Sequence, residues 1–217
     1  MADPHPGYGL REELVHAVTH GVGLVLSAVG LGVLVARTAS RGDARDVLAC
    51  AVFGVALVLL YGASTLYHGV RRPAAKRALQ VADHAAIYVL IAGSYTPFAL
   101  AGLAGRGGGA LLAGVWALAG LGVVLEVARP RAARRLALPL YLAMGWLAVL
   151  VLGPLARALG PDGLALLVGG GAAYTLGVVF YAWRRCPYHH AIWHGFVLAG
   201  SALHFSCVLA HVVPPAG

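Results

Sequence analysis

The residues of this chain that could do chemistry are a few polar side chains inside long apolar stretches. His190 and His194 are four residues apart, as are Ser64 and His68, and Asp83 lies in a third apolar stretch. Residues four apart on a helix are neighbours on one face, so the imidazoles of His190 and His194 can grip one ion, and a hydroxyl lies one turn from the imidazole of His68. Three imidazoles that leave one position open make a catalytic zinc site, in which water is the fourth ligand.

A zinc site of this kind needs a base. Zinc lowers the pKa of its bound water towards about 7, and a nearby carboxylate can then accept the proton. We therefore predict that His68, His190 and His194 bind zinc and that Asp83 is the general base. The alternative for each histidine alone is a hydrogen bond to a neighbouring helix.

The chain that carries these residues has the composition of an integral membrane protein. Hydrophobic residues make up 60% of the 217, charged residues only 11%, and the mean hydropathy is +0.81. A soluble domain carries about a quarter charged residues, and a helix needs about 20 apolar residues to cross the hydrocarbon core. We predict one all-α domain, residues 1–217, with seven transmembrane helices. The stretches that define them are Leu14–Ala36, Val47–Val70, Ala78–Gly105 (interrupted only by Asp83), Gly107–Leu125, Leu136–Ala156, Gly163–Trp183 and Cys186 to the end.

The distribution of lysine and arginine predicts the orientation of these helices. With the N-terminus inside, eleven basic residues lie on the inner side and five on the outer side. The positive-inside rule then places the N-terminus in the cytoplasm and the C-terminus outside the cell. The net charge of +8 is explained by contact with anionic headgroups rather than by binding of nucleic acid. The inner residues are Arg11, Arg71, Arg72, Lys76, Arg77, Arg129, Arg131, Arg134, Arg135, Arg184 and Arg185, and the outer ones are Arg37, Arg41, Arg45, Arg106 and Arg157.

This orientation brings the candidate residues to one depth. Counted from the arginines that flank their helices, His68, Asp83, His190 and His194 all lie about 4–14 Å inside the inner boundary of the membrane. Ligand-type side chains from three different helices therefore share one level. The polar first fifteen residues do not resemble a cleavable signal peptide, so we expect the first helix to stay as an anchor.

Other polar residues near this level have simpler interpretations. His16 and His20 are also four residues apart and lie at a similar depth, so spacing alone does not exclude them as ligands, and we interpret them as a polar lining. His84 points about 100° away from its neighbour Asp83 around a helix, which indicates a packing or supporting role. Glu126 is interpreted as one half of an interfacial ion pair.

At these residues the sequence resembles the hemolysin III group, the bacterial branch of the progestin and adipoQ receptor family. The matching motifs are SxxxH at Ser64–His68, D-H-x-x-I-Y-x-L-I-A-G-S-Y-T-P-F at Asp83–Phe98 and H-x-x-x-H at His190–His194. Thr-His-Gly at Thr19–Gly21 is also similar. One departure concerns the first helix, where the family usually has an acidic residue followed by Asn, whereas here Glu13 is followed by His16.

The resemblance implies a seven-helix fold with a cytoplasmic N-terminus and zinc held by His68, His190 and His194. It further implies that Asp83 lies next to the zinc-bound water and that Ser64 supports the site. Eukaryotic relatives such as the adiponectin receptors are associated with ceramide-hydrolysing activity, and the wider superfamily contains alkaline ceramidases. The bacterial branch is named for haemolysis.

Three classes of function are compatible with these features. The first is a zinc-dependent hydrolase of a lipid amide or ester in the cell membrane, with Asp83 as general base. The second is a hemolysin-like pore or ion-homeostasis protein in which the zinc is structural. The third is a sensor of membrane state without turnover. In all three, the expected partners are membrane lipids and not nucleic acid.

Overall fold

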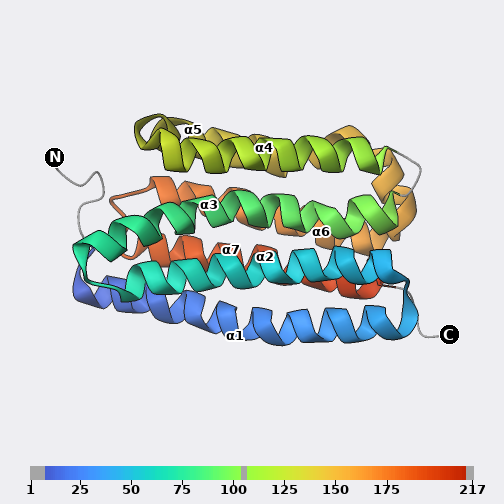
Figure 1. Ribbon diagram of the computed structural model, residues 1–217, viewed down its shortest axis with the longest axis horizontal. Coiled ribbons are helices and arrows are strands. Elements are labelled where there is room, and N and C mark those ends of the chain that lie inside the picture. Colours follow the sequence, from blue (N-terminus) through green and yellow to red (C-terminus); the bar gives the residue numbers. More distant parts are fainter. Residues whose placement is uncertain (1–7, 104–106, 214–217) are drawn as a thin grey trace.

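The computed structural model describes residues 8–103 and 107–213, and every regular element in these ranges is a helix (Figure 1). The predicted all-α class is confirmed. The long helices are α1 (Leu10–Arg41), α2 (Ala44–Gly69), α3 (Pro73–Pro97), α4 (Gly108–Ala128), α5 (Pro130–Gly145), α6 (Leu152–Ala182) and α7 (His189–Cys207). Three short helical segments, Phe98–Gly102, Leu147–Val151 and Val208–Val212, continue α3, α5 and α7.

The ends of these helices follow from residues that cap or interrupt them. Asp43 begins α2, because its carboxylate accepts hydrogen bonds from the backbone N–H groups of Arg45 and Asp46 at 2.8 and 3.0 Å. Pro73 and Pro130 stand in the first turn of α3 and α5, where a missing N–H costs nothing. Consecutive helices from α1 to α5 pack against one another, as do α6 and α7.

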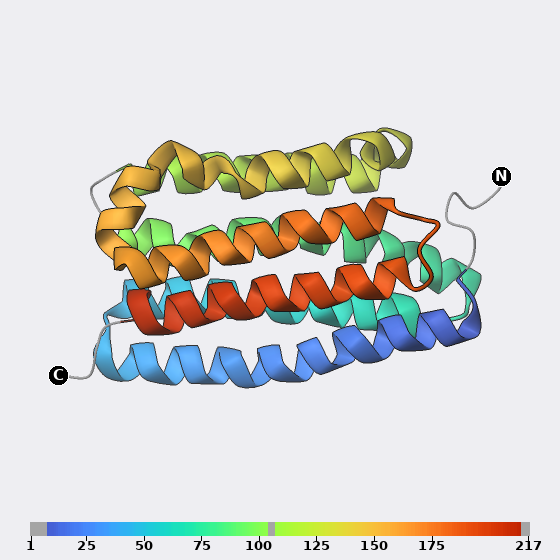
Figure 2. The same ribbon diagram turned by 180° about the vertical axis from the view of Figure 1, so that it is seen from behind.

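The helices pack as a bundle with their long axes roughly parallel (Figures 1 and 2). Helix α1 packs against both α2 and α7, α2 against α3, and α6 against α7. Small residues permit close approach: a Cβ added at Gly93 of α3 would lie only 2.6 Å from the Cβ of Ala56 on α2. Large apolar side chains such as Val25 and Leu150 point outward, 63% and 78% exposed, as expected for a lipid-facing surface.

Six helical stretches are long and apolar enough to cross a membrane. They correspond to α1, α2, α3 with its extension, α4, the stretch Pro130–Ala182 taken as one, and α7 with its extension. The predicted spans Leu136–Ala156 and Gly163–Trp183 both fall within Pro130–Ala182. Inside this stretch, α6 bends at Gly160, whose φ of 67° and ψ of 179° are not helical. The count of seven spans and their orientation stay predictions.

Candidate metal centre

Five histidines from three helices meet at one end of the bundle. His16 and His20 come from α1, His68 from α2, and His190 and His194 from α7. All five are buried, with at most 8% of their surface exposed. The bundle brings them together because α1 packs against both α2 and α7 (Figure 1). The common depth expected for His68, His190 and His194 is therefore matched by proximity in space.

The closest grouping within this cluster includes His16, for which the sequence predicts the role of a polar lining residue. Ring nitrogens of His16, His68 and His190 lie within 4.8 Å of one another. The ring centre of His194 is 4.5 Å from that of His190 and 5.3 Å from that of His68. The ring of His20 stacks on His194, with centres 3.5 Å apart and planes inclined by 10°. The three predicted ligands are thus neighbours, and His16 is an equal member of the group.

The sequence explains locally why each ring reaches the cluster. His68 is in the last turn of α2, where the partial negative charge of a helix C-terminus favours a cation. His190 is in the first turn of α7, after Tyr188 turns the chain with a φ of 55°. On α1 and α7 the four-residue spacing places two imidazoles on the same face. Each helix therefore contributes its rings through ordinary helical geometry.

Glu13 fixes the orientation of one imidazole. Its carboxylate accepts a hydrogen bond from Nδ1 of His68 at 2.7 Å and one from Nζ of Lys76 at 2.8 Å. With the proton held on Nδ1, the lone pair of His68 is on Nε2, which is buried and has no hydrogen-bond partner among the described residues. Carboxylate–histidine pairs of this kind are the usual outer support of metal-binding histidines.

The remaining ring nitrogens test whether a metal fits this site. Both nitrogens of His16, His20, His190 and His194 are buried and lack hydrogen-bond partners within the described ranges. A buried polar atom left unpaired costs about 1–3 kcal/mol, so a cluster of them is unfavourable unless something binds there. Neutral imidazoles are good ligands for zinc. The donor set and its burial fit a zinc ion.

Asp83 lies beside the imidazole cluster and outside its closest grouping. It is buried on α3, with 7% of its surface exposed, and its carboxylate interacts with the Ser64 hydroxyl of α2. Asp83 and His20 both line a cavity of about 130 Å³. The two residues predicted to act with the metal, Ser64 and Asp83, are therefore close to each other, and Asp83 lines this cavity.

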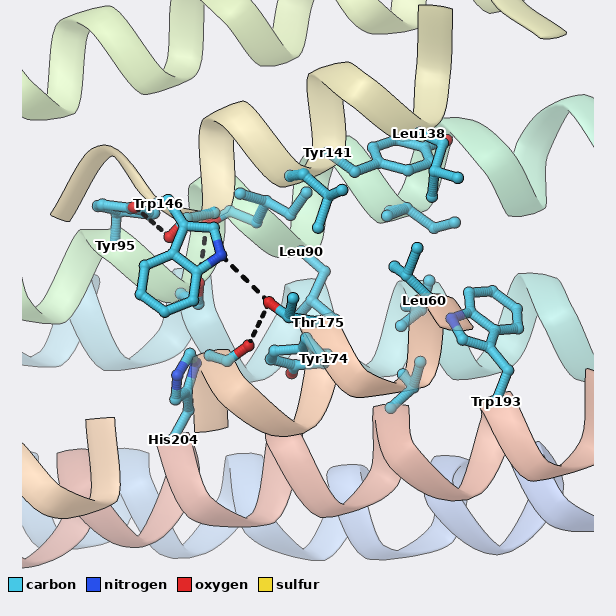
Figure 3. Close-up of a pocket in the computed structure, with 18 of the residues that line it drawn as sticks. Leu60, Leu90, Tyr95, Leu138, Tyr141, Trp146, Tyr174, Thr175, Trp193 and His204 are labelled. Atoms are coloured by element: carbon cyan, nitrogen blue, oxygen red, sulfur yellow. Dashed lines mark hydrogen bonds between the residues drawn. The ribbon is translucent and has the colours of Figure 1, made fainter. Parts of the chain in front are cut away.

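The cavity itself is almost entirely apolar. It extends from Asp83 and His20 between α3, α5, α6 and α7, past Leu60, Leu90 and Trp193, to His204 (Figure 3). Trp146, which also lines it, donates a hydrogen bond from its indole N–H to the Thr175 hydroxyl at 3.1 Å. A hydrocarbon chain is the kind of ligand that such walls can accommodate.

Two residues near the cluster, Glu126 and Tyr8, add to the description of its surroundings. Glu126 is only 4% exposed, and its carboxylate lies 3.6 Å from Nδ1 of His84, which is its ion-pair partner when protonated. Helix α4 turns this carboxylate towards α3. Tyr8 packs edge-on against His16, with ring centres 4.7 Å apart, and burial raises the pKa of its hydroxyl to about 12. Tyr8 therefore covers the cluster as a neutral side chain.

Comparison with known proteins connects this geometry to a family. The family model described as haemolysin-III related matches residues 8–205, which include all five histidines and Asp83. The chain belongs to the haemolysin III-related family. It is 44% identical over 206 residues to the hemolysin-3 homolog of Bacillus subtilis, covering 95% of this chain and 97% of that protein.

Two further relatives, one bacterial and one human, are less similar to the chain. The chain is 42% identical to hemolysin-3 of Bacillus cereus over 95% of its length and 94% of that protein. It is 28% identical to the human monocyte to macrophage differentiation factor over 91% of its length and 83% of that protein. The family and the six apolar helical stretches together identify a multi-pass protein of the cell membrane.

Two features of the site were not predicted from the sequence. The place of His16 beside His68 and His190 could have been suspected from its four-residue spacing to His20 and its depth. The bond from His68 to Glu13 could not, because it depends on the rotation of α1 against α2.

Proposed function

We propose that this protein is a zinc-dependent hydrolase of a lipid amide or ester in the cell membrane. In this proposal His68, His190 and His194 hold the ion, Asp83 is the general base and Ser64 supports Asp83. The observation that carries it is the adjacency of a buried imidazole cluster to an apolar cavity, with Asp83 at the boundary between them. This arrangement offers a reactive group and a place for the apolar chain of a lipid.

Each part of the site has a defined task in this reaction. His68, His190 and His194 would hold the zinc ion, which would supply activation of water and polarisation of the carbonyl group of an amide or ester. Asp83 accepts a proton, and its interaction with Ser64 keeps the carboxylate aimed in one direction. Glu13 holds the tautomer of His68 in which Nε2 is free to bind. The cavity walls exclude water from the lipid chain and align it with the polar end of the site.

The proposal includes seven membrane spans with the metal site on the cytoplasmic side. Helices α1 and α7 run in the same direction (Figure 2). Their histidines pair in the same order: the ring centres of His16 and His190 are 4.7 Å apart, and those of His20 and His194 are 3.5 Å apart. Parallel first and last helices require an odd number of crossings. This supports our proposal that the stretch Pro130–Ala182 crosses twice, with its reversal near Gly160.

The proposal is tested with the purified protein in lipid nanodiscs, loaded with zinc and given a panel of lipid amides and esters. Released fatty acid is measured by mass spectrometry. Asp83→Asn keeps the size of the side chain and removes the base, so it should retain zinc and thermal stability while hydrolysis falls by about 10²–10⁴-fold. Asp162→Asn, at an exposed position, is the matched control and should hydrolyse as the parent does.

Two results would contradict the proposal. The first is that the zinc-loaded parent protein releases no fatty acid from any substrate of the panel. The second is that Asp83→Asn hydrolyses as fast as Asp162→Asn. Loss of zinc from Asp83→Asn would show instead that Asp83 supports the ion, and the base would have to be another residue.

A further inference from the structure

Four of the five imidazoles form a nearly regular tetrahedron. The six distances between the ring centres of His16, His68, His190 and His194 all fall between 4.5 and 5.4 Å. His16 takes part in three of them, at 4.8 Å to His68, 4.7 Å to His190 and 5.4 Å to His194. None of the four rings is an outlier.

These distances match the spacing expected for four imidazoles around one zinc ion. Zinc–nitrogen bonds are about 2.0–2.1 Å long, which places each ring centre about 3.2 Å from the ion and tetrahedrally arranged ring centres about 5.2 Å apart. The observed range includes this value. Ring nitrogens of three of the four, His16, His68 and His190, lie within 4.8 Å of one another.

We infer that His16 is a fourth protein ligand of the ion, together with His68, His190 and His194. Each of the four rings has a buried nitrogen without a hydrogen-bond partner in the part of the chain that the structure describes. His20 does not belong to the set, because it stacks flat on His194 at 3.5 Å. The lone pairs of two stacked rings lie in parallel planes and do not converge on one ion.

The inference changes what the site can do at rest. Four protein ligands make a closed zinc site, whereas a catalytic site keeps one position for water. His16 occupies the position that water needs in the proposed hydrolase. Turnover therefore requires His16 to leave the ion. This step rests on the proposed zinc binding, and it does not depend on whether the protein hydrolyses lipids.

The test removes the ring nitrogens of His16 and keeps an aromatic ring at that position. His16→Phe retains an aromatic ring against Tyr8 and cannot bind metal, and His20→Phe is the matched control on the same helix, where the stack on His194 is retained. His16→Ala serves as a second variant if phenylalanine disturbs folding, and His190→Ala is the positive control for loss of a ligand. The purified full-length proteins are loaded with Co²⁺ or Zn²⁺, and thermal unfolding verifies that each is folded.

Three measurements report on the ligands independently of activity. The visible spectrum of the Co²⁺ protein reports coordination, X-ray absorption of the Zn²⁺ protein counts imidazoles, and added azide detects an open position. The parent and His20→Phe should show four imidazoles and no response to azide. His16→Phe should show three imidazoles, a spectrum that changes with azide, and an affinity lowered by at least the 10–100-fold that loss of an outer partner costs.

The outcomes separate this inference from the proposed function. If His16→Phe and His16→Ala both keep the parental spectrum, imidazole count and affinity, His16 is not a ligand, whatever the hydrolysis assay shows. If the Co²⁺ spectrum of both variants changes with azide and zinc-loaded His16→Phe hydrolyses lipids faster than the parent, the ligand assignment and the proposed hydrolase are both supported. If the spectrum changes with azide and no protein of the set hydrolyses any lipid, the ligand assignment is supported and the hydrolase is rejected.

Discussion

Removal of the charge on Glu13 should weaken metal binding although this residue does not contact the ion in our assignment. The Glu13 carboxylate holds two donors at once, Nδ1 of His68 at 2.7 Å and Nζ of Lys76 at 2.8 Å. In Glu13→Gln, the amide has one oxygen and one NH₂ group, so it can accept only one of these hydrogen bonds. The NH₂ group would then face the other donor.

The size of the effect follows from the role of the bond. Loss of an outer hydrogen bond to a metal-binding histidine typically costs 10–100-fold in affinity, which corresponds to about 1.4–2.8 kcal/mol. We expect the upper part of this range, because the side chain of His68 is completely buried and that of Glu13 is only 16% exposed. Water therefore replaces the lost bond poorly.

The assay is competition for Zn²⁺ between the purified protein and a chromophoric chelator. Glu12→Gln is the matched control. It makes the same chemical change one residue earlier, where the carboxylate accepts a hydrogen bond from the backbone N–H of Gly9 at 3.1 Å. Equal zinc affinities for Glu13→Gln and Glu12→Gln would show that the bond to His68 does not tune the site.

Two further predictions concern packing and topology. Gly122→Ala places a Cβ against the ring of Tyr88, which is fully buried, and should lower stability by about 1–3 kcal/mol; Gly120→Ala on the same helix meets no atom within 4 Å and should melt like the parent in detergent. A reporter fused to the C-terminus should read the outside of the cell, and one in the Arg71–Arg77 connection should read the cytoplasm; the reverse pattern would move the metal site to the outer leaflet.

Much of the fold could be predicted because the membrane limits the choices. Long charge-free stretches must be helices, since unpaired backbone groups are too costly in lipid. The predicted span Val47–Val70 closely matches α2, Ala44–Gly69. The stretch Pro130–Ala182 was harder: α5 ends at Gly145, earlier than the apolar stretch Leu136–Ala156 suggests, and the chain continues through Leu147–Val151. Apolar composition does not reveal where a helix bends when both sides of the bend face lipid.

The depth of the site residues in the membrane was easier to predict than the rotation of the helices that carry them. Flanking arginines placed His68, His190 and His194 in one layer, about 4–14 Å inside the inner boundary, and this was enough to bring them together. Which faces of α1 and α7 meet is set by packing of small residues against bulky ones: a Cβ added at Gly23 of α1 would lie 2.8 Å from Leu198 of α7. Such contacts involve residues far apart in the sequence.

His16 and His20 show why one turn matters for function. They share a helix face and differ by about 6 Å along the axis of α1. The lower ring, His16, is level with His190 and within reach of His68, whereas the upper ring, His20, is level with His194 and borders the cavity with Asp83. Two histidines on the same face of one helix thus have different surroundings: His16 faces the imidazoles of His68 and His190, and His20 faces the cavity. In our proposal, this single turn of α1 decides whether the metal site is closed or open to water.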